Sequence, residues 1–154
     1  MRKYLSVLLL SFLPVLAWAG GDYYDFSRLR QVKGVESVYI TSQMTKAMKS
    51  GKSSIVTNMN FGMGQQMENV DSILTLSTEQ KSALGEFKKV LAALRKKSGY
   101  QVLMERIEDD EVTYIIAHPK AGSTTEYDEM IIINLDDDEG RIVQLIGTLV
   151  APGK

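Results

Sequence analysis

The chain has 154 residues, with 18 Lys and Arg against 19 Asp and Glu, and it contains no cysteine. This length suits a single domain, and the lack of cysteine excludes disulfides, a cysteine nucleophile and a lipid-anchored N-terminal cysteine. A formal net charge of −1 lacks the basic excess typical of nucleic-acid binding, so we expect no nucleic-acid partner.

The first residues are typical of a signal peptide. A basic start is followed by an apolar stretch from Leu5 to Leu16 and by the small-x-small sequence AWA. We expect residues 1–19 to be a signal peptide cleaved near Ala19-Gly20, and residues 20–154 to form a single α+β domain. The apolar stretch is shorter than the about 20 residues of a membrane span, so we expect a periplasmic or secreted protein without membrane insertion after cleavage.

The first half of this domain combines helix caps with β-branched runs. Asp25 or Ser27 would cap a first helix that Gly34 ends, and Gly51 would end a second helix. The runs VESVYIT and DSILTLS are rich in β-branched residues and predict strands. In chain order we expect a helix at 25–34, a strand at 35–41, a helix at 41–51, a loop with a short helix at 51–70 and a strand at 71–77.

The clearest element is a long helix that follows the second strand. Ser77 and Gln80 fit a capping box at its start, and Gly99 fits a left-handed end. Its apolar residues recur at helical spacing and should pack on a sheet: Ala83, Leu84, Phe87, Val90, Leu91 and Leu94.

Four strands complete the chain as two hairpins, each with an acidic tip. They are YQVLMERI (100–107), VTYIIAH (112–118), EYDEMIIINL (126–135) and RIVQLIGTLV (141–150). The order β-α-β-α-β-β-β-β predicts an α+β fold, an antiparallel-rich sheet with helices packed on one face as a two-layer sandwich. An exposed edge of such a sheet leaves a homodimer open as one arrangement.

The acidic run Asp136–Glu139 raises the question of a calcium site. An EF-hand loop needs oxygen ligands at its first, third and fifth positions, glycine at the sixth and glutamate at the twelfth. Counted from Asp136, the fifth residue is Gly140 and the twelfth is Gly147, so the pattern fails. The run therefore predicts a hydrated hairpin tip, with a non-standard calcium site as the alternative.

No complete catalytic set is recognisable in the sequence. His118 is the single histidine, too few for the common zinc sites, and no G-x-S-x-G elbow accompanies it. SGKSS and GMGQQM imitate phosphate-binding loops but each lacks a required glycine. We expect a protein that is not an enzyme and that has no cofactor, with His118 a half-exposed residue at the end of a strand.

Methionines recur every fourth residue in two stretches, at 44–48 and at 59–67. Thioether clusters can bind Cu(I), but no cysteine and no nearby histidine complete such a site. Methionine also lines adaptable interaction surfaces. The residues we predict to bind a partner are Met44, Met48, Phe61 and Met63.

Three segments together resemble a known family. KGVESVYITSQM (33–44), GYQVLMERIEDDEVTYII (99–116) and EMIIINLDDDEGRIVQLIGTL (129–149) are similar to the domain-of-unknown-function family DUF4252. The resemblance implies a small exported protein of a Gram-negative bacterium, with a weak association with sigma-factor and anti-sigma-factor signalling. The family has no assigned activity, so it implies no catalytic residues.

These observations lead to one expected function and one alternative. We expect an exported, non-enzymatic protein that binds another envelope protein, with a role in envelope signalling or the stress response. The alternative is a periplasmic module that binds a small ligand or a metal ion through the methionine-rich segment or the acidic tips.

Overall fold

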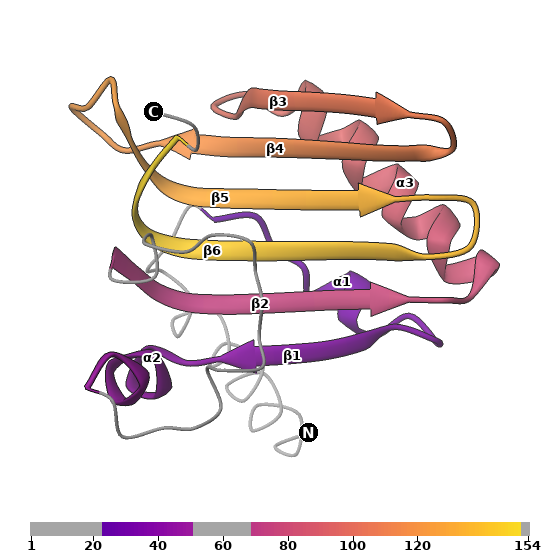
Figure 1. Ribbon diagram of the computed structural model, residues 1–154, viewed down its shortest axis with the longest axis horizontal. Coiled ribbons are helices and arrows are strands. Elements are labelled where there is room, and N and C mark those ends of the chain that lie inside the picture. The colour runs from indigo at the N-terminus through magenta and orange to yellow at the C-terminus, as the bar shows by residue number, and fades with distance from the viewer. Residues whose placement is uncertain (1–22, 51–68, 152–154) are drawn as a thin grey trace, which may run out of the picture.

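The computed structural model describes residues 23–50 and 69–151, which form a six-stranded antiparallel sheet with three helices (Figure 1). The elements are α1 (Ser27–Arg30), β1 (Glu36–Ile40), α2 (Ser42–Lys49), β2 (Val70–Thr78), α3 (Lys81–Lys96), β3 (Gln101–Glu108), β4 (Glu111–Pro119), β5 (Glu126–Leu135) and β6 (Gly140–Val150). The expected α+β fold with an antiparallel sheet is confirmed. The short helix expected within residues 51–70 falls almost wholly on residues outside the described part.

The strands lie in the order β1-β2-β6-β5-β4-β3. The last strand in the sequence therefore lies between β2 and β5, where it joins the N-terminal strands to the β3–β4–β5 meander (Figure 1). Of the described helices, none is both long enough and apolar enough to cross a membrane.

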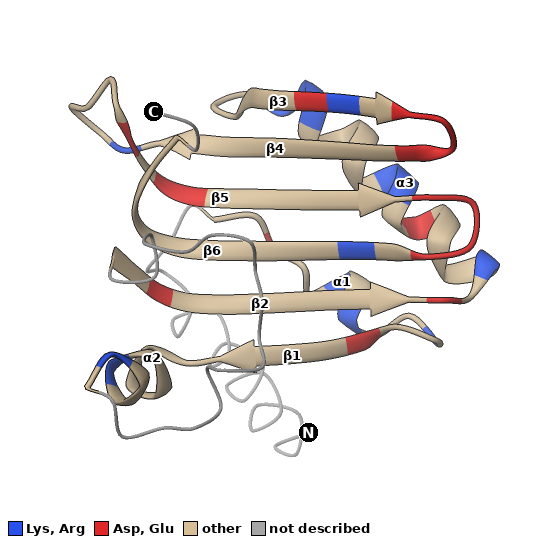
Figure 2. Ribbon diagram, in the orientation of Figure 1, with Lys and Arg blue, Asp and Glu red and all other residues tan. Residues whose placement is uncertain are grey.

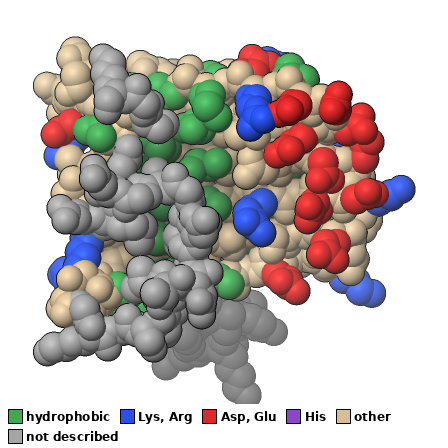
Figure 3. Space-filling view, in the orientation of Figure 1, with side chains coloured by type: hydrophobic (Ala, Val, Ile, Leu, Met, Phe, Trp, Pro, Cys, Tyr) green, Lys and Arg blue, Asp and Glu red, His purple; other side chains and the backbone are tan. Residues whose placement is uncertain are grey.

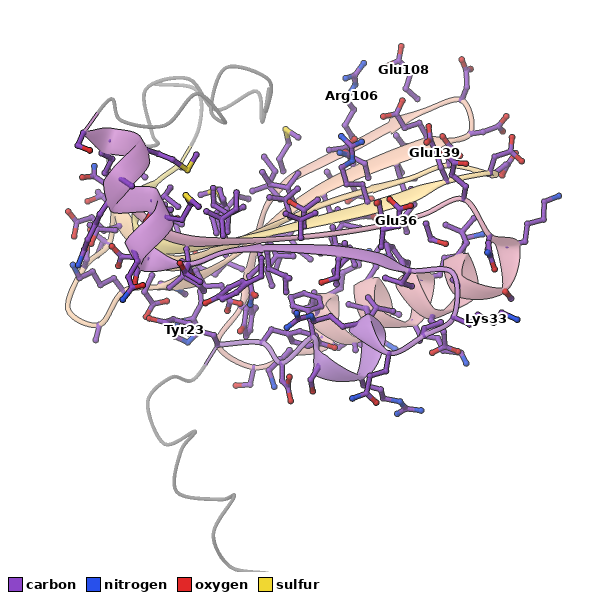
Figure 4. The ribbon with its side chains drawn as sticks, turned by 90° about the horizontal axis from the view of Figure 1, so that it is seen from below. Tyr23, Lys33, Glu36, Arg106, Glu108 and Glu139 are labelled. Atoms are coloured by element: carbon purple, nitrogen blue, oxygen red, sulfur yellow. The ribbon has the colours of Figure 1, made fainter. Side chains whose placement is uncertain are left out.

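One face of the sheet, here called the α3 face, carries α1 and α3 (Figures 1 and 4). The helical spacing correctly predicted the buried side of α3, which comprises Ala83, Leu84, Phe87, Leu91 and Leu94. Phe87 packs in one cluster with Leu76 of β2 and Ile133 of β5. Burial of this apolar area, at about 25 cal/mol per Å², is the main stabilisation of the layer.

The start of α3 differs from the predicted capping box. Ser77 lies within β2, where it pairs with Glu36, and Gln80 occupies the N-cap position without a side-chain cap. The Thr78 hydroxyl instead accepts from the backbone N–H of Gln80 at 3.1 Å and donates to the carbonyl oxygen of Gly34 at 2.8 Å. The strand continues past Ser77 because that residue has a cross-strand partner.

The other side of the sheet, here called the opposite face, has its own apolar cluster. Met48 of α2 packs there with Ile40 and Ile73, so α2 does not share the face of α1 and α3 (Figure 4). This detail differs from the expectation that the helices would share one face. It follows from the chain direction, because α2 starts directly after Ile40, which points to the opposite face.

Strand pairing arranges the opposite face in three rows that cross the sheet. The first row is apolar and buried over five strands, with Ile40, Ile73, Leu145, Met130 and Ala117, and it ends at the exposed Gln101 of β3. The second contains Val38, Thr75, Val143, Ile132, Ile115 and Met104. The third is polar: Glu36, Ser77, Arg141, Asn134, Thr113 and Arg106. The face thus changes from apolar to charged along the strands.

Gly147 marks a close approach between β6 and the start of β2. A Cβ at this position would lie 2.1 Å from the carbonyl oxygen of Asn69, whereas a Cβ at Gly85 of α3 would meet nothing within 4 Å. We expect Gly147→Ala to lower the free energy of unfolding by about 2 kcal/mol, because backbone must move. Gly85→Ala should raise it by up to about 1 kcal/mol, since alanine favours the helix.

Urea unfolding of both variants and the parent measures these two free energies. If Gly147→Ala is as stable as the parent, the backbones at Gly147 and Asn69 do not approach each other closely.

Candidate functional site

Glu129 of β5 is a carboxylate whose side chain is 0% exposed within the α3 face. It accepts hydrogen bonds from the Tyr100 hydroxyl, from Gln144 Nε2 at 2.5 Å and from the backbone N–H of Tyr24 at 3.1 Å. A buried charge without such partners would be very costly. Three donors suit an ionised carboxylate, which can only accept.

Burial and hydrogen bonding act in opposite directions on this carboxyl group. Burial raises the pKa of Glu129, and the hydrogen bonds from Tyr100, Gln144 and Tyr24 offset part of that rise. Burial and the hydrogen bond to Glu129 also raise the pKa of Tyr100. Tyr100 therefore stays a neutral donor throughout the physiological pH range.

The network attaches the N-terminal segment to the sheet. Gln144 Nε2 donates to the carbonyl oxygen of Tyr24 at 3.0 Å, so both backbone polar groups of Tyr24 are bound by side chains of β5 and β6. Phe26, with its ring centroid 4.7 Å from that of Tyr24, is buried in the α3-face core. The buried polar pair thus fixes where α1 starts.

A shallow hollow of about 500 Å³ lies beside this network, lined by Tyr23, Lys97, Tyr100 and His118 among others. The His118 Nδ1 atom is 2.8 Å from Asp128 Oδ1, and its ring contacts Tyr100 edge-on with centroids 5.3 Å apart. His118 is half-buried near the end of β4, as its place in the sequence suggested.

This arrangement supports anchoring better than acid–base chemistry. A catalytic acid or base must reach the proton that it transfers. Glu129 has no exposed surface, and both of its oxygens are already hydrogen-bonded. Within the described part of the chain, His118 bonds Asp128 and no serine or threonine hydroxyl, so no activated nucleophile is formed there.

Acidic side chains gather at the other end of the sheet, where the β3–β4 and β5–β6 turns lie (Figures 2 and 3). This acidic end comprises Glu36, Glu79, Glu108, Asp109, Asp110, Glu111, Asp136, Asp137, Asp138 and Glu139. An open cleft of about 760 Å³ lies among Glu36, Glu139 and Arg141. Figure 4 places Glu36, Arg106, Glu108 and Glu139 on the side of the sheet away from α3.

The β5–β6 turn is stabilised by its own first carboxylate. Asp136 Oδ1 accepts from the backbone N–H groups of Asp138 and Glu139 at 2.7 Å each, and the Asp136 N–H donates to the Glu139 carbonyl oxygen at 3.0 Å. The predicted hairpin tip is confirmed. Within residues 23–50 and 69–151, no three His, Cys, Asp or Glu side chains are grouped to hold a metal ion.

The four residues predicted to bind a partner have different settings. Met44 is 41% exposed on α2, whereas Met48, one turn later, is 8% exposed and packs in the opposite-face cluster. Phe61 and Met63 lie outside the described residues. The structure therefore places one of the four, Met44, where a partner can reach it.

Sequence reasoning missed the network around Glu129. Strand side chains alternate between the two faces of a sheet, so Glu129 should point to the same face as Ile131 and Ile133. By the same rule Gln144 should point to the face of Ile142, which is also buried in the α3-face core. Two polar residues at inward positions of neighbouring strands were the available signal. Tyr100 lies just before β3, where alternation does not specify a direction.

Comparison with models of known protein families gives a match. A model of the family described as Domain of unknown function (DUF4252) matches residues 24–150. No curated protein and no solved structure matches the chain.

The raised pKa of Glu129 has a consequence for stability. A carboxyl group with a raised native-state pKa stabilises the fold fully below its unfolded pKa, and this contribution is lost as the pH rises through the native pKa. Glu129→Gln removes that titration. We expect the variant to show a smaller fall in the free energy of unfolding between weakly acidic and neutral pH than the parent.

Urea unfolding at several pH values measures this difference, with Glu126→Gln on the same strand as the matched control. The control should keep the pH dependence of the parent. An unchanged pH dependence in Glu129→Gln would contradict the assignment. Glu129→Ala should cost about 2 kcal/mol at weakly acidic pH, because buried donors lose their acceptor.

The geometry of the acidic tip also predicts its response to calcium. Asp136 Oδ1 is already bound by two N–H groups, so we expect millimolar calcium to leave the melting temperature unchanged. A cation that bound the folded protein would raise it by mass action. Thermal denaturation with calcium and with a chelator is the measurement, and a calcium-dependent rise abolished by Asp138→Asn would contradict this prediction.

Proposed function

Because the chain belongs to the domain-of-unknown-function family DUF4252, we propose that it is a non-enzymatic protein of the bacterial envelope that acts by binding another envelope protein. The signal-peptide pattern of residues 1–19 supports the envelope location. A role in envelope signalling or the stress response is part of the same proposal.

The observation that carries the proposal is the exposure of large apolar side chains at the margins of the opposite face. Val38 is 48% exposed, and Met44 and Met104 are exposed to a similar extent. Exposed apolar groups beside a charged region are typical of protein interaction sites. Here the charged region is the third row of that face and the acidic end next to it (Figure 3).

Helix α2 offers the best single contact for a partner. Met48 holds the helix against the sheet, and Met44 lies one turn earlier on the same side and is 41% exposed. The N-terminus of α2 is fixed by Thr41, whose hydroxyl accepts from the Met44 N–H at 3.3 Å. A flexible methionine on a fixed helix can pack against a partner without rearrangement of the fold.

The charge distribution would orient such a partner. Arg106 and Glu108 form an ion pair on β3. Arg141 lies in the same polar row as Arg106 and lines the cleft together with Glu36 and Glu139. Charged rims affect the rate and orientation of association more than its affinity. A partner that covers Met44 and reaches the acidic end would carry basic groups at that end.

A small-ligand module is the second candidate, and the hollow next to His118 and Lys97 is the observation that favours it. The two candidates differ in what the purified protein retains. Native mass spectrometry of the parent and of the His118→Ala variant separates the two. A small molecule that is bound to the parent and missing from the variant would favour the ligand module over the adaptor.

The adaptor proposal is tested by chemical crosslinking in intact cells that express the tagged full chain, followed by mass spectrometry. We expect one dominant protein adduct that Met44→Asp reduces about tenfold, because a desolvated carboxylate would replace an apolar contact. The melting temperature of the purified variant should not change, since Met44 is exposed.

Gln43→Asp is the matched control on the same helix and should leave the adduct intact. If Met44→Asp leaves the adduct unchanged, Met44 is not in the interface. If only adducts between copies of this chain appear, binding to another envelope protein is contradicted.

A further inference from the structure

Among the strands of the described residues, β1 and β3 lie at the two edges of the sheet, and the two edges differ. The β3 edge is interrupted by a register shift between Val102 and Met104 and carries Glu105, Arg106 and Glu108. It ends in the acidic β3–β4 turn, which adds further charge at the end of this edge. Bulges and charges of this kind are the usual means of preventing edge-to-edge association.

The β1 edge lacks this protection. Its five residues pair with β2 without a register shift, and Glu36 is the one charged residue among them. Val38 and Tyr39 are both about half exposed, with Tyr39 at 54%. A continuous edge strand with exposed apolar side chains is a template for pairing with another strand.

We propose that β1 pairs with β1 of a second copy of this chain, antiparallel, about a two-fold axis at Val38. This register pairs every residue of the strand: Val38 with Val38, Ser37 with Tyr39, and Glu36 with Ile40. Shifting the axis to Ser37 or Tyr39 leaves only three residues of each strand paired. The opposite faces of the two copies then form one continuous surface. This inference does not rest on the proposed function.

Side chains on the α1 side of the strand are complementary in this register. The Ser37 hydroxyl accepts from Arg30 Nε at 3.0 Å, so the Arg30 guanidinium lies beside Ser37. Tyr39 of the second copy lies directly opposite Ser37. Its ring is thereby brought to the guanidinium, a contact that is favourable between arginine and an aromatic face.

The charge at the end of the strand is also complementary. Glu36 of one copy lies opposite Ile40 of the other, immediately before the N-terminus of α2. The first turn of α2 contains no acidic residue, so no carboxylate of its own first turn interacts with the positive end of the helix dipole. In this register the Glu36 carboxylate of the other copy is brought to that end. The two Glu36 side chains lie at opposite ends of the ladder and do not repel each other.

A ladder of this length buries less surface than a standard permanent interface, so a weak, reversible dimer is expected. Sedimentation equilibrium of the full chain, from micromolar to near-millimolar concentration, should show monomer and dimer. Val38→Arg places like charges opposite each other and should weaken dimerisation at least about tenfold. A monomer at every concentration, or a dimer unaffected by Val38→Arg, overturns the proposal.

Disulfide formation tests the register, because the natural chain has no cysteine. Directly opposed Cα atoms lie about 4.5 to 5.5 Å apart, within the range of a disulfide. Val38→Cys should therefore crosslink two copies on oxidation. Tyr39→Cys should crosslink poorly alone and well when mixed with Ser37→Cys.

Ile107→Cys is the matched control on the other edge strand and should not crosslink. If Ile107→Cys crosslinks and Val38→Cys does not, pairing occurs through β3 and the proposal is wrong. If Tyr39→Cys crosslinks more readily than Val38→Cys, the two-fold axis is not at Val38 and the proposed register is overturned.

Discussion

The register of the five antiparallel ladders is the constraint on which the rest of the molecule depends. Side chains alternate between faces with a period of two, so a slip of one residue would move an entire apolar set to the wrong face. Four of the ladders contain one register shift. The shift in β5 has a visible effect, since Tyr127 packs on the opposite face while Glu129, two residues later, points into the α3 face. Without that irregularity Glu129 and Tyr127 would share a face.

The buried carboxylate of Glu129 is a second determinant of the structure, because it specifies one position of the N-terminal segment on the sheet. An apolar residue at position 129 could be buried at lower cost, because a buried charge needs several donors to offset its desolvation. What Glu129 adds is a unique acceptor for the Tyr24 N–H, held in place by Gln144 and Tyr100. Apolar packing of Phe26 alone would tolerate several positions of the N-terminal segment. The hydrogen bonds select one position, and so define where α1 lies relative to the sheet.

Much of the fold was predictable because local signals agree with the tertiary structure. The β-branched runs became β1 and β2, the stripe of α3 became its buried side, and both acidic tips became turns. The capping box at Ser77 was wrong because cross-strand pairing with Glu36 extended β2 beyond the local signal. The strand order and the Glu129 network were not predictable, since both depend on which distant segments meet. Of the candidate partner residues, the pattern could not distinguish exposed Met44 from buried Met48, because residues four apart share one side of a helix.

The position of β6 between β2 and β5 has a consequence for the order of folding. β2 pairs with a strand that lies far along the sequence, so the sheet has many contacts of high sequence separation. Chains of this kind fold slowly, because the entropy of loop closure must be lost before the contacts form. Until β6 arrives, β2 and β5 each present an unsatisfied edge. The interval before β6 inserts is therefore the stage at which the chain is most exposed to aggregation, and at which a folding factor would have most effect.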